Sequence, residues 1–175
     1  MSIAFPRVQD PEQIAQAARL ASEIWTRHYR DIVDPAQIDY MLRRFQSPSA
    51  IAEQIGQQGY AYHLILWQDQ PAGYLAYAPR EGGLFLSKIY LQAQRQGRGL
   101  GYGAARFVWQ QALELRLDRV WLTVNRHNQQ AIRAYRRWGF ETVGELVQDI
   151  GDGFVMDDYR MEWRQLHFDT ERTEA

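Results

Sequence analysis

Four glycines stand at alternate positions from Gly97 to Gly103, between an apolar segment that ends at Leu91 and a segment with helical spacing of its apolar residues. Glycine lets the backbone approach a ligand closely, and the unpaired N–H groups of a first helical turn point at that ligand. The helix dipole adds only about 0.3–1 kcal/mol at an exposed site, so the N–H donors must provide most of the binding. The segment therefore predicts a pyrophosphate-binding loop.

Two other phosphate-binding loops fit this segment less well. A P-loop needs a lysine directly after its last glycine, and the only lysine of the chain, Lys88, lies upstream. A dinucleotide loop fits better, since Gly99 to Ala104 matches Gly-x-Gly-x-x-Ala. That loop follows its strand directly and needs an acidic residue at the end of the next strand, where this chain has Asn125. A dinucleotide-binding oxidoreductase therefore remains a minor alternative.

The loop resembles the Gln/Arg-x-x-Gly-x-Gly/Ala motif of the GCN5-related N-acetyltransferases (GNAT). A second motif of that family is an Asn before a helix that carries a Tyr and closes in Gly-Phe, and Asn128, Tyr135 and Gly139-Phe140 match it. The resemblance covers roughly Leu75 to Trp163. Within the family, the segments that look closest to the polyamine- and small-amine-acetylating (PaiA-like) branch are Lys88-Ile89-Tyr90-Leu91 and Asp157-Asp158-Tyr159-Arg160-Met161.

The resemblance implies acetyl-CoA as co-substrate. It also implies a splay between the strand that ends near Leu91, whose backbone N–H would polarise the thioester carbonyl, and the strand that ends at Val124. Asn128 can cap a helix and also touch the cofactor, and Arg98 can either meet a phosphate or be a solvated loop residue. The expected cofactor-binding residues are Ile89, Tyr90, Leu91, Gln96, Gly97, Arg98, Gly99, Leu100, Gly101, Tyr102, Asn128 and Tyr135.

The resemblance makes Tyr135 the general acid that protonates the departing thiolate. A phenol pKa near 10 lies close to that of an alkyl thiol, so the proton would pass with little mismatch. The alternative is a core tyrosine that shares its helical stripe with Ala131 and Ile132. Tyr135 is the only catalytic side chain that the motifs assign.

The general base is not assigned by the motifs. An amine that must lose its proton at pH 7 needs about 4–5 kcal/mol. Some relatives carry a Glu in the middle of the strand Val120–Val124, where this chain has Thr123, and others carry an acid on the strand before the loop, where Ser87 and Ile89 offer none. A water wire or one of four acids remains, and each acid is more readily expected as a solvated surface charge: Glu23, Asp31, Asp157 and Asp158.

Aromatic residues of the first helices suggest an acceptor pocket. Trp25, His28, Tyr29 and Tyr40, next to acids such as Asp31 and Asp34, could form a wall that suits a cationic amine. The alternative is that these rings pack under the sheet and that His28 is structural. No His pair or carboxylate cluster has metal-ligand spacing, so no metal is expected.

The elements that would position these residues follow from apolar periodicity and from Pro and Gly breaks. Asp10-Pro11-Glu12-Gln13 starts a helix, Asp34-Pro35 starts a second, and a third is expected from Ala50 to about Gln57. The long helix follows the glycine loop, and another follows Asn128. Strands are expected at Ile3–Val8, Tyr62–Trp67, Gly73–Ala78, Leu84–Leu91, Val120–Val124, Thr142–Gln148 and Val155–Trp163.

This pattern predicts an α/β protein with a mixed, mostly antiparallel twisted sheet of about seven strands flanked by helices. The family's order would be β-α-α-β-β-β-α-β-α-β-β. At 175 residues the chain is expected to form a single N-acetyltransferase domain over residues 1–165, followed by a polar tail at 166–175 that frays.

Composition excludes several function classes. A formal charge of −1 with 46% hydrophobic residues indicates neither disorder nor a nucleic-acid partner. The absence of cysteine excludes disulfides, thiolate metal sites and a covalent acetyl-cysteine. No apolar run approaches the ~20 residues of a membrane span and no secretory signal is seen, so a cytoplasmic protein without a membrane partner is expected. The aromatic content of 13% leaves room for a homodimer interface.

The sequence therefore predicts a transferase that moves acetyl from acetyl-CoA to a primary amine, with a small-molecule or polyamine-like acceptor favoured. Direct attack in a ternary complex is expected, because no cysteine can carry the acetyl group. Two alternatives remain: a protein or peptide N-acetyltransferase, and a non-catalytic acyl-CoA-binding regulatory module.

Overall fold

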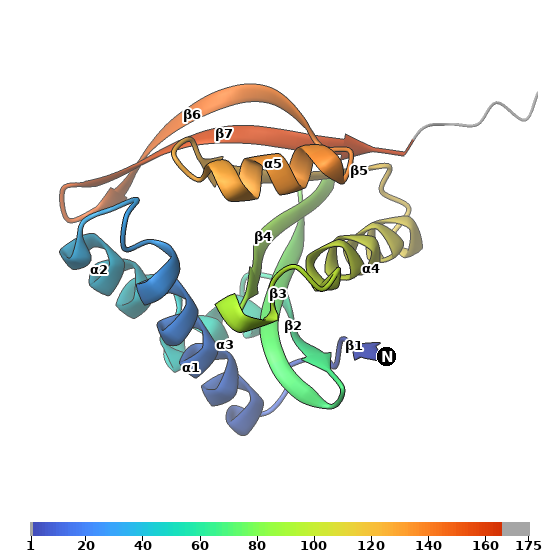
Figure 1. Cartoon of the computed structure of the whole chain (residues 1–175), viewed down its shortest axis with the longest axis horizontal. Coiled ribbons are helices and arrows are strands. Elements are labelled where there is room, and N and C mark those ends of the chain that lie inside the picture. The colour runs from blue at the N-terminus through green and yellow to red at the C-terminus, as the bar shows by residue number, and fades with distance from the viewer. Residues whose placement is uncertain (1, 166–175) are drawn as a thin grey trace, which may run out of the picture.

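One seven-stranded sheet organises residues 2–165, the part of the chain that this computed structural model describes (Figure 1). The strand order is β1-β2-β3-β4-β5-β7-β6, with a single parallel pair, β4 and β5, among antiparallel ones. The predicted polar tail at 166–175 lies outside the described residues. The strands are β1 (Ile3–Ala4), β2 (Ala61–Trp67), β3 (Gln70–Arg80), β4 (Gly83–Leu91), β5 (Arg119–Asn125), β6 (Glu141–Gly151) and β7 (Phe154–Arg164).

The helices begin where the sequence places a cap or a proline. Asp10 forms the expected capping box with Gln13 at the start of α1, and each of the first three helices has a proline at its start. The third helix begins two residues earlier than predicted, because Ser47 caps it by accepting a hydrogen bond from the backbone N–H of Ala50. The α-helices are α1 (Pro11–His28), α2 (Pro35–Phe45), α3 (Pro48–Gly56), α4 (Leu100–Glu114) and α5 (Gln129–Arg137).

The predicted first strand is shorter than expected. It was expected to run from Ile3 to Val8, but β1 ends at Ala4 and only a single bridge between Arg7 and His63 follows. Pro6 has no backbone N–H to donate and therefore interrupts the ladder. Within residues 2–165, no helix is long and apolar enough to cross a membrane.

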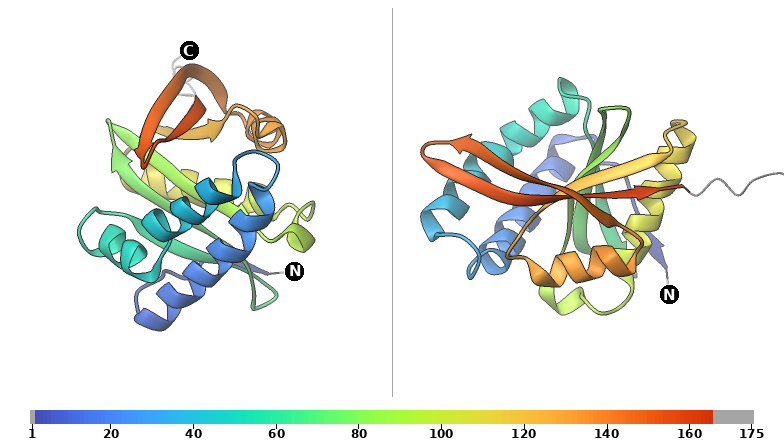
Figure 2. Two further views of the ribbon diagram at one scale, coloured as in Figure 1. Left: turned by 90° about the vertical axis from the view of Figure 1, so that its left-hand side faces the viewer. Right: turned by 90° about the horizontal axis from the view of Figure 1, so that it is seen from above.

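Each face of the sheet carries its own hydrophobic core. Successive strand residues point to opposite faces, so Leu75 of β3 packs with α4 and α5, whereas Tyr74 and Ala76 pack with α1, α2 and α3. The three N-terminal helices therefore cover one face, and α4 and α5 cover the other (Figure 2). Both cores share the central strands, which hold the helices at fixed positions around the edge where β4 and β5 end.

The parallel pair separates after two residue pairs. Leu84 pairs with Val120 and Phe85 with Trp121, and β4 and β5 form no further residue pairs beyond these positions. β4 stays paired with β3 as far as Leu91. The splay implied by the family resemblance is thus confirmed, and it leaves one edge of β4 open towards the interior of the molecule.

Candidate active site

The glycine loop leads from β4 into α4, and its glycines serve two purposes. Gly97 and Gly99 both have φ 75°, a backbone conformation that other residues adopt at a cost, and a Cβ at either would meet no heavy atom within 4 Å. Gly101 and Gly103 lie inside α4 instead. A Cβ at Gly101 would come within 2.7 Å of the Trp138 ring. The first two glycines shape an open loop, and Gly101 lets α4 approach the end of α5.

A groove of about 380 Å³ runs beside this loop, between the end of β4 and α5. Most of the predicted cofactor-binding residues line it: Ile89, Tyr90, Leu91, Gln96, Gly97, Gly99, Gly101, Tyr102 and Tyr135. Gln96 is held from the other wall, because the side-chain amide of Gln130 donates to its Oε1 at 3.0 Å.

Three of the predicted cofactor residues do not line the groove. The side chain of Leu100 is buried. The guanidinium of Arg98 stacks over Trp67, 4.6 Å from the ring centre, which favours its alternative as a loop residue without a ligand. Asn128 faces a neighbouring cavity instead. For these three side chains, the motif match did not predict the direction in which they point.

Asn128 fixes the start of α5 and thereby the position of Tyr135. Its side-chain oxygen accepts from the backbone N–H of Ala131 at 3.3 Å, and its Nδ2–H donates to Nε2 of His28 at 2.8 Å. Tyr135 lies seven residues later, about two helical turns, and hence on the same face. Its ring rests against Trp138 and Phe140, each with a centroid distance of 5.6 Å. The predicted helix cap is confirmed, and it joins α5 to α1.

Burial raises the pKa of the Tyr135 phenol well above its usual value near 10. The phenol therefore stays protonated throughout the neutral range, as a proton donor must. Its pKa is also farther from that of a thiol than the sequence suggested. The sequence proposed Tyr135 as a proton donor, and it did not predict how far burial raises the pKa of the phenol.

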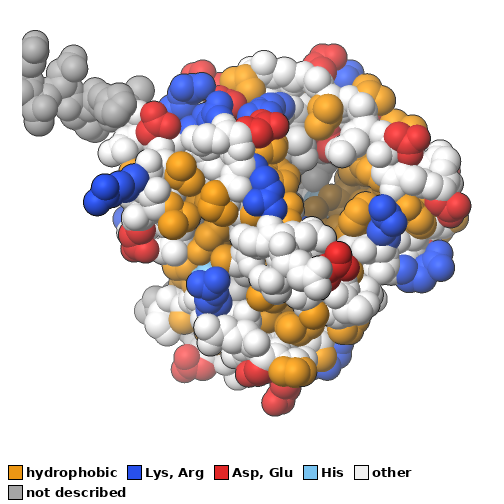
Figure 3. All heavy atoms as spheres, turned by 180° about the vertical axis from the view of Figure 1, so that it is seen from behind, with side chains coloured by type: hydrophobic (Ala, Val, Ile, Leu, Met, Phe, Trp, Pro, Cys, Tyr) orange, Lys and Arg blue, Asp and Glu red, His pale blue; other side chains and the backbone are white. Residues whose placement is uncertain are grey.

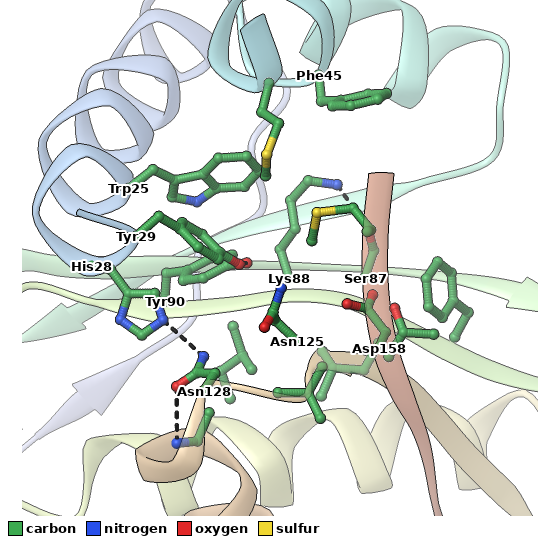
Figure 4. A pocket seen from close by; sticks show the side chains of 18 of the residues that line it. Trp25, His28, Tyr29, Phe45, Ser87, Lys88, Tyr90, Asn125, Asn128 and Asp158 are labelled. Atoms are coloured by element: carbon green, nitrogen blue, oxygen red, sulfur yellow. Dashed lines mark hydrogen bonds between the residues drawn. The ribbon is translucent and has the colours of Figure 1, made fainter. Parts of the chain in front are cut away.

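Tyr135 also lines a second cavity, of about 410 Å³. Figure 4 shows this cavity from close by, with Trp25, Lys88 and Asp158 among its labelled side chains. We call it the acceptor cavity. It shares five wall residues with the groove: His28, Ile89, Tyr90, Ala131 and Tyr135. The space-filling view from behind shows a hollow bordered by hydrophobic side chains on that face of the molecule (Figure 3). The two cavities therefore meet at the residue that the sequence proposed as the acid.

Aromatic side chains of α1 and β4 form one wall of the acceptor cavity. Tyr29 and Tyr90 share a hydrogen bond of 2.7 Å between their hydroxyls, and the Trp25 ring lies 5.3 Å from that of Tyr90. Burial lowers the pKa of His28, so its ring is neutral at pH 7, consistent with Nε2 accepting from Asn128. The prediction that Trp25, His28 and Tyr29 line a pocket is confirmed.

Three other residues predicted for this wall lie elsewhere. Tyr40 donates to the backbone carbonyl of Ile150 at 2.8 Å and packs on Phe154, so it fastens α2 to the β6–β7 hairpin. Asp31 and Asp34 line a separate cavity. The prediction of an acidic wall next to these rings is therefore wrong, since both acids follow α1 on a loop whose side chains line the separate cavity.

Of the four acids proposed as general bases, Asp158 faces the acceptor cavity. It sits on β7 opposite Asn125 of β5, is 7% exposed, and its Oδ1 has no hydrogen-bond partner within residues 2–165. Its pKa is raised to about 6: burial is the main cause, a hydrogen bond with Thr123 acts in the opposite direction, and the charge of the neighbouring Asp157 adds a smaller rise. The expectation that Asp158 is a solvated surface charge is wrong.

The remaining three acids are engaged or exposed. Glu23 accepts from the Gln92 side chain at 3.2 Å on the surface. Asp157 forms an ion pair of 2.8 Å with Arg126, and Asp31 is exposed. Neighbouring residues of one strand point to opposite faces of the sheet. Asp158 therefore faces the cavity, whereas Asp157 points away from it.

Lys88, which lines this cavity, is not among the site residues that the sequence predicted. Lys88 lies in β4, is 9% exposed, and lines the acceptor cavity together with polar residues such as Gln54 and Gln148. A single lysine within the apolar segment Leu86–Leu91 was the available signal. Within residues 2–165, no three His, Cys, Asp or Glu side chains are grouped as a metal site requires.

Comparison with known proteins places this geometry in a family. The family model described as "Acetyltransferase (GNAT) family" matches residues 18–140, well over half of the chain. The chain is 34% identical over 68 residues to a spermine/spermidine N(1)-acetyltransferase of Bacillus subtilis, a match that covers 38% of this chain and 45% of that protein. It is 32% identical over 82 residues to a spermidine N(1)-acetyltransferase of Escherichia coli, covering 46% and 42%.

A similar solved structure is that of a PaiA N-acetyltransferase from Thermoplasma acidophilum in complex with coenzyme A. The TM-score is 0.77 at 17% identity, over 94% of this chain and all of that one, and at this identity the likeness shows the fold. The match spans less than half of the length of the curated relatives named above. With two family motifs at the splay of the sheet and a family model over residues 18–140, the chain belongs to the acetyltransferase (GNAT) family.

Proposed function

We propose that this protein is an N-acetyltransferase that moves the acetyl group of acetyl-CoA to the primary amine of a small molecule. The observation that carries the proposal is that a groove beside the glycine loop and a cavity with a buried carboxylate meet at Tyr135. An acetyl group presented from the groove would meet an amine presented from the cavity. Polyamines, named in the relatives from Bacillus subtilis and Escherichia coli, are among the acceptors to be compared.

The residues of the groove fit coenzyme A. Gly97 and Gly99 leave their backbone unobstructed, and the first turn of α4 offers N–H groups without helical partners, which suits a pyrophosphate. The edge of β4 that faces the splay offers further backbone groups from Leu86 to Leu91. Acetyl-CoA would supply an activated acetyl thioester, and the chain would supply its placement.

Asp158 is proposed as the general base. A carboxyl with a pKa of about 6 is largely ionised at pH 7 and is a stronger base than an ordinary carboxylate. It would take the proton that the ammonium must lose before the nitrogen lone pair can attack. Burial supports this role, because removal from bulk water also disfavours the charged form of the amine.

Tyr135 is proposed as the general acid. When the C–N bond forms and the C–S bond breaks, the sulfur leaves with an electron pair, and the phenol would give it a proton. Tyr135 lies on α5 and lines both cavities, so its hydroxyl would be near the position where these bonds change. The nitrogen loses two protons on its way to the amide. Asp158 would take the first, before the attack, and the second, released once the C–N bond has formed, would restore the Tyr135 phenol that gave its proton to the sulfur.

A thiol-release assay with acetyl-CoA and a panel of amines tests the proposal. We expect turnover by the wild-type protein and a loss on the order of a hundredfold in kcat for Tyr135→Phe, which removes one hydroxyl. Equal activity of Tyr135→Phe would remove the phenol from the mechanism.

Acetylation of peptides alone would favour a peptide acetyltransferase, and binding of coenzyme A without turnover of any amine would favour a non-catalytic module. A rise in melting temperature with coenzyme A and not with NAD separates both from a dinucleotide-binding protein.

A further inference from the structure

Lys88 is the one cation among the lining residues of the acceptor cavity in the described structure, and the proposed base Asp158 is the one carboxylate. The Lys88 ammonium donates to Oγ of Ser87 at 2.7 Å and lies 3.4 Å from Oε1 of Gln54. The rings of Tyr60 and Tyr62 lie 5.4 and 5.5 Å from its Nζ. Figure 4 shows the side chain reaching from β4 past the aromatic wall.

The surroundings of Lys88 are fixed by hydrogen bonds. Gln54 donates to the backbone carbonyl of Phe45 at 2.8 Å and accepts from the hydroxyl of Tyr62 at 2.5 Å, and both side chains are buried. Gln54 is therefore held in place, and together with Ser87 it fixes the position of the Lys88 amine. A lysine ammonium has three donors, and the protein provides two acceptors, so one donor remains for a ligand in the cavity.

Lys88 also lacks a counterion, since no ion pair within residues 2–165 includes it. A buried charge without a partner is costly, and burial lowers the pKa of Lys88 to about 7. Near neutral pH its amine is thus close to half protonated, and an anion beside it would favour the charged form. A single positive group matches a singly charged anion such as a carboxylate.

We propose that Lys88 binds a carboxylate of the acceptor, so that the acceptor is an amine that also carries a carboxyl group. The inference rests on the proposed function: the amine end lies towards Asp158 and Tyr135, and the carboxylate end towards Lys88. A polyamine would instead place a second ammonium in a cavity that already holds a lysine and has one carboxylate. The chain therefore differs in its acceptor from the spermidine-acetylating proteins that it resembles.

Matched acceptors test this in the wild-type protein. Phenylalanine and δ-aminovalerate are compared with their carboxamides, and with cadaverine and spermidine. We expect kcat/KM to be at least about tenfold higher for each amino carboxylate than for its carboxamide, because a hydrogen bond to a charged group is lost. In Lys88→Met, which keeps an unbranched side chain one atom shorter and without the amine, that ratio should fall to near one. Arg43→Met, an exposed change that lines neither cavity, should keep the wild-type ratio.

A measurement without turnover separates this inference from the proposed function. Lys88 is the only lysine, so isotope-labelled lysine gives one side-chain NMR signal that reports its protonation. Amino carboxylates should raise the pKa of Lys88, and their carboxamides and spermidine should not. A response of this signal without acetylation of any amine would support the anion site and end the proposed function. Turnover of polyamines in preference to amino carboxylates, with a silent lysine signal, would overturn the inference and leave the function standing. If Lys88→Met fails to fold, the wild-type comparison and the NMR signal still decide.

Discussion

At the scale of single residues, burial moves the pKa of two oppositely charged groups in one cavity towards neutral pH. It raises the pKa of Asp158 to about 6 and lowers that of Lys88 to about 7. Both changes have the same cause, which is the loss of water around a charged group. A carboxylate that gains basicity suits proton removal, and an amine that is easily charged or discharged suits an anionic ligand. Burial in the same cavity thus suits Asp158 to accept a proton and Lys88 to bind an anion.

The pH profile of Asp158→Asn tests the proposed base. In the wild-type protein, kcat/KM should rise with pH through about 6, as the carboxyl loses its proton and becomes able to accept one. Asparagine cannot accept this proton, so the variant should lose activity by about 10²-fold or more and should lack this rise. Initial rates from pH 5 to pH 9 provide the measurement. A rise near pH 6 that survives in the variant would assign the base elsewhere.

Stability gives this variant an internal control. The folded protein holds the proton of Asp158 more tightly than the unfolded chain, whose carboxyl has a pKa near 4. Folding therefore loses stability as pH rises from about 4 to about 6, and the loss persists above pH 6. Asp158→Asn should accordingly melt at a higher temperature than the wild type at pH 7, with a smaller difference below pH 4. Loss of activity together with higher stability would exclude misfolding as the cause.

At the scale of elements, the sequence predicted what local patterns determine. Asp10 and Asn128 cap helices as expected, and the glycine loop lies between β4 and α4. The contact made by Tyr40 could not be predicted from the sequence. Helical spacing indicates that its ring faces inwards, but it does not indicate which strand the ring contacts. Its partner, the carbonyl of Ile150, lies 110 residues away on the β6–β7 hairpin. Contacts of this kind depend on the packing of the whole sheet.

The contact between α2 and the hairpin closes one side of the acceptor cavity, and Tyr40→Phe tests its importance. Ile150 and Met156 of the hairpin line that cavity, and neither lines the groove. Loss of the hydrogen bond from Tyr40 to Ile150 should cost about 1 kcal/mol. We expect KM for the amine to rise several-fold, because the hairpin is held less firmly, while the affinity for coenzyme A stays unchanged. Steady-state kinetics and calorimetric titration with coenzyme A measure the two effects.

Tyr159→Phe is a matched control on the same hairpin. The hydroxyl of Tyr159 makes no hydrogen bond within the described residues. The Arg126 guanidinium lies over its ring, 5.1 Å from the centre, and phenylalanine would keep this contact. The control should leave both constants unchanged. An equal loss of amine binding and coenzyme binding in Tyr40→Phe would show that α2 and the hairpin act on the fold as a whole rather than on one cavity.

At the scale of the whole molecule, the candidate site draws on segments that are far apart in sequence. α1 contributes His28, β4 contributes Ile89 and Tyr90, and α5 contributes Ala131 and Tyr135 to the wall between the two cavities. The family motifs predicted the β4 and α5 parts, because each motif is local. The burial of Asp158 and Lys88 arises only when β7 and α3 close around the splay. Motifs therefore located the cofactor side. On the acceptor side the sequence predicted the aromatic wall and not the burial of Asp158 and Lys88.

The shared wall also determines the expected order of events. If acetyl passes directly between two molecules that meet at Tyr135, both must be bound before any product leaves. Double-reciprocal plots at several fixed amine concentrations should then intersect. A covalent acetyl-enzyme would give parallel lines and a protein heavier by one acetyl group after incubation with acetyl-CoA alone. The chain has no cysteine, and Lys88 is the side-chain amine in reach of the acceptor cavity. Mass spectrometry of the incubated protein, with Lys88→Met as the control, therefore decides between direct transfer and a covalent acetyl-enzyme. Unmodified wild-type protein with intersecting plots supports direct transfer. Acetylated Lys88 with parallel plots contradicts it.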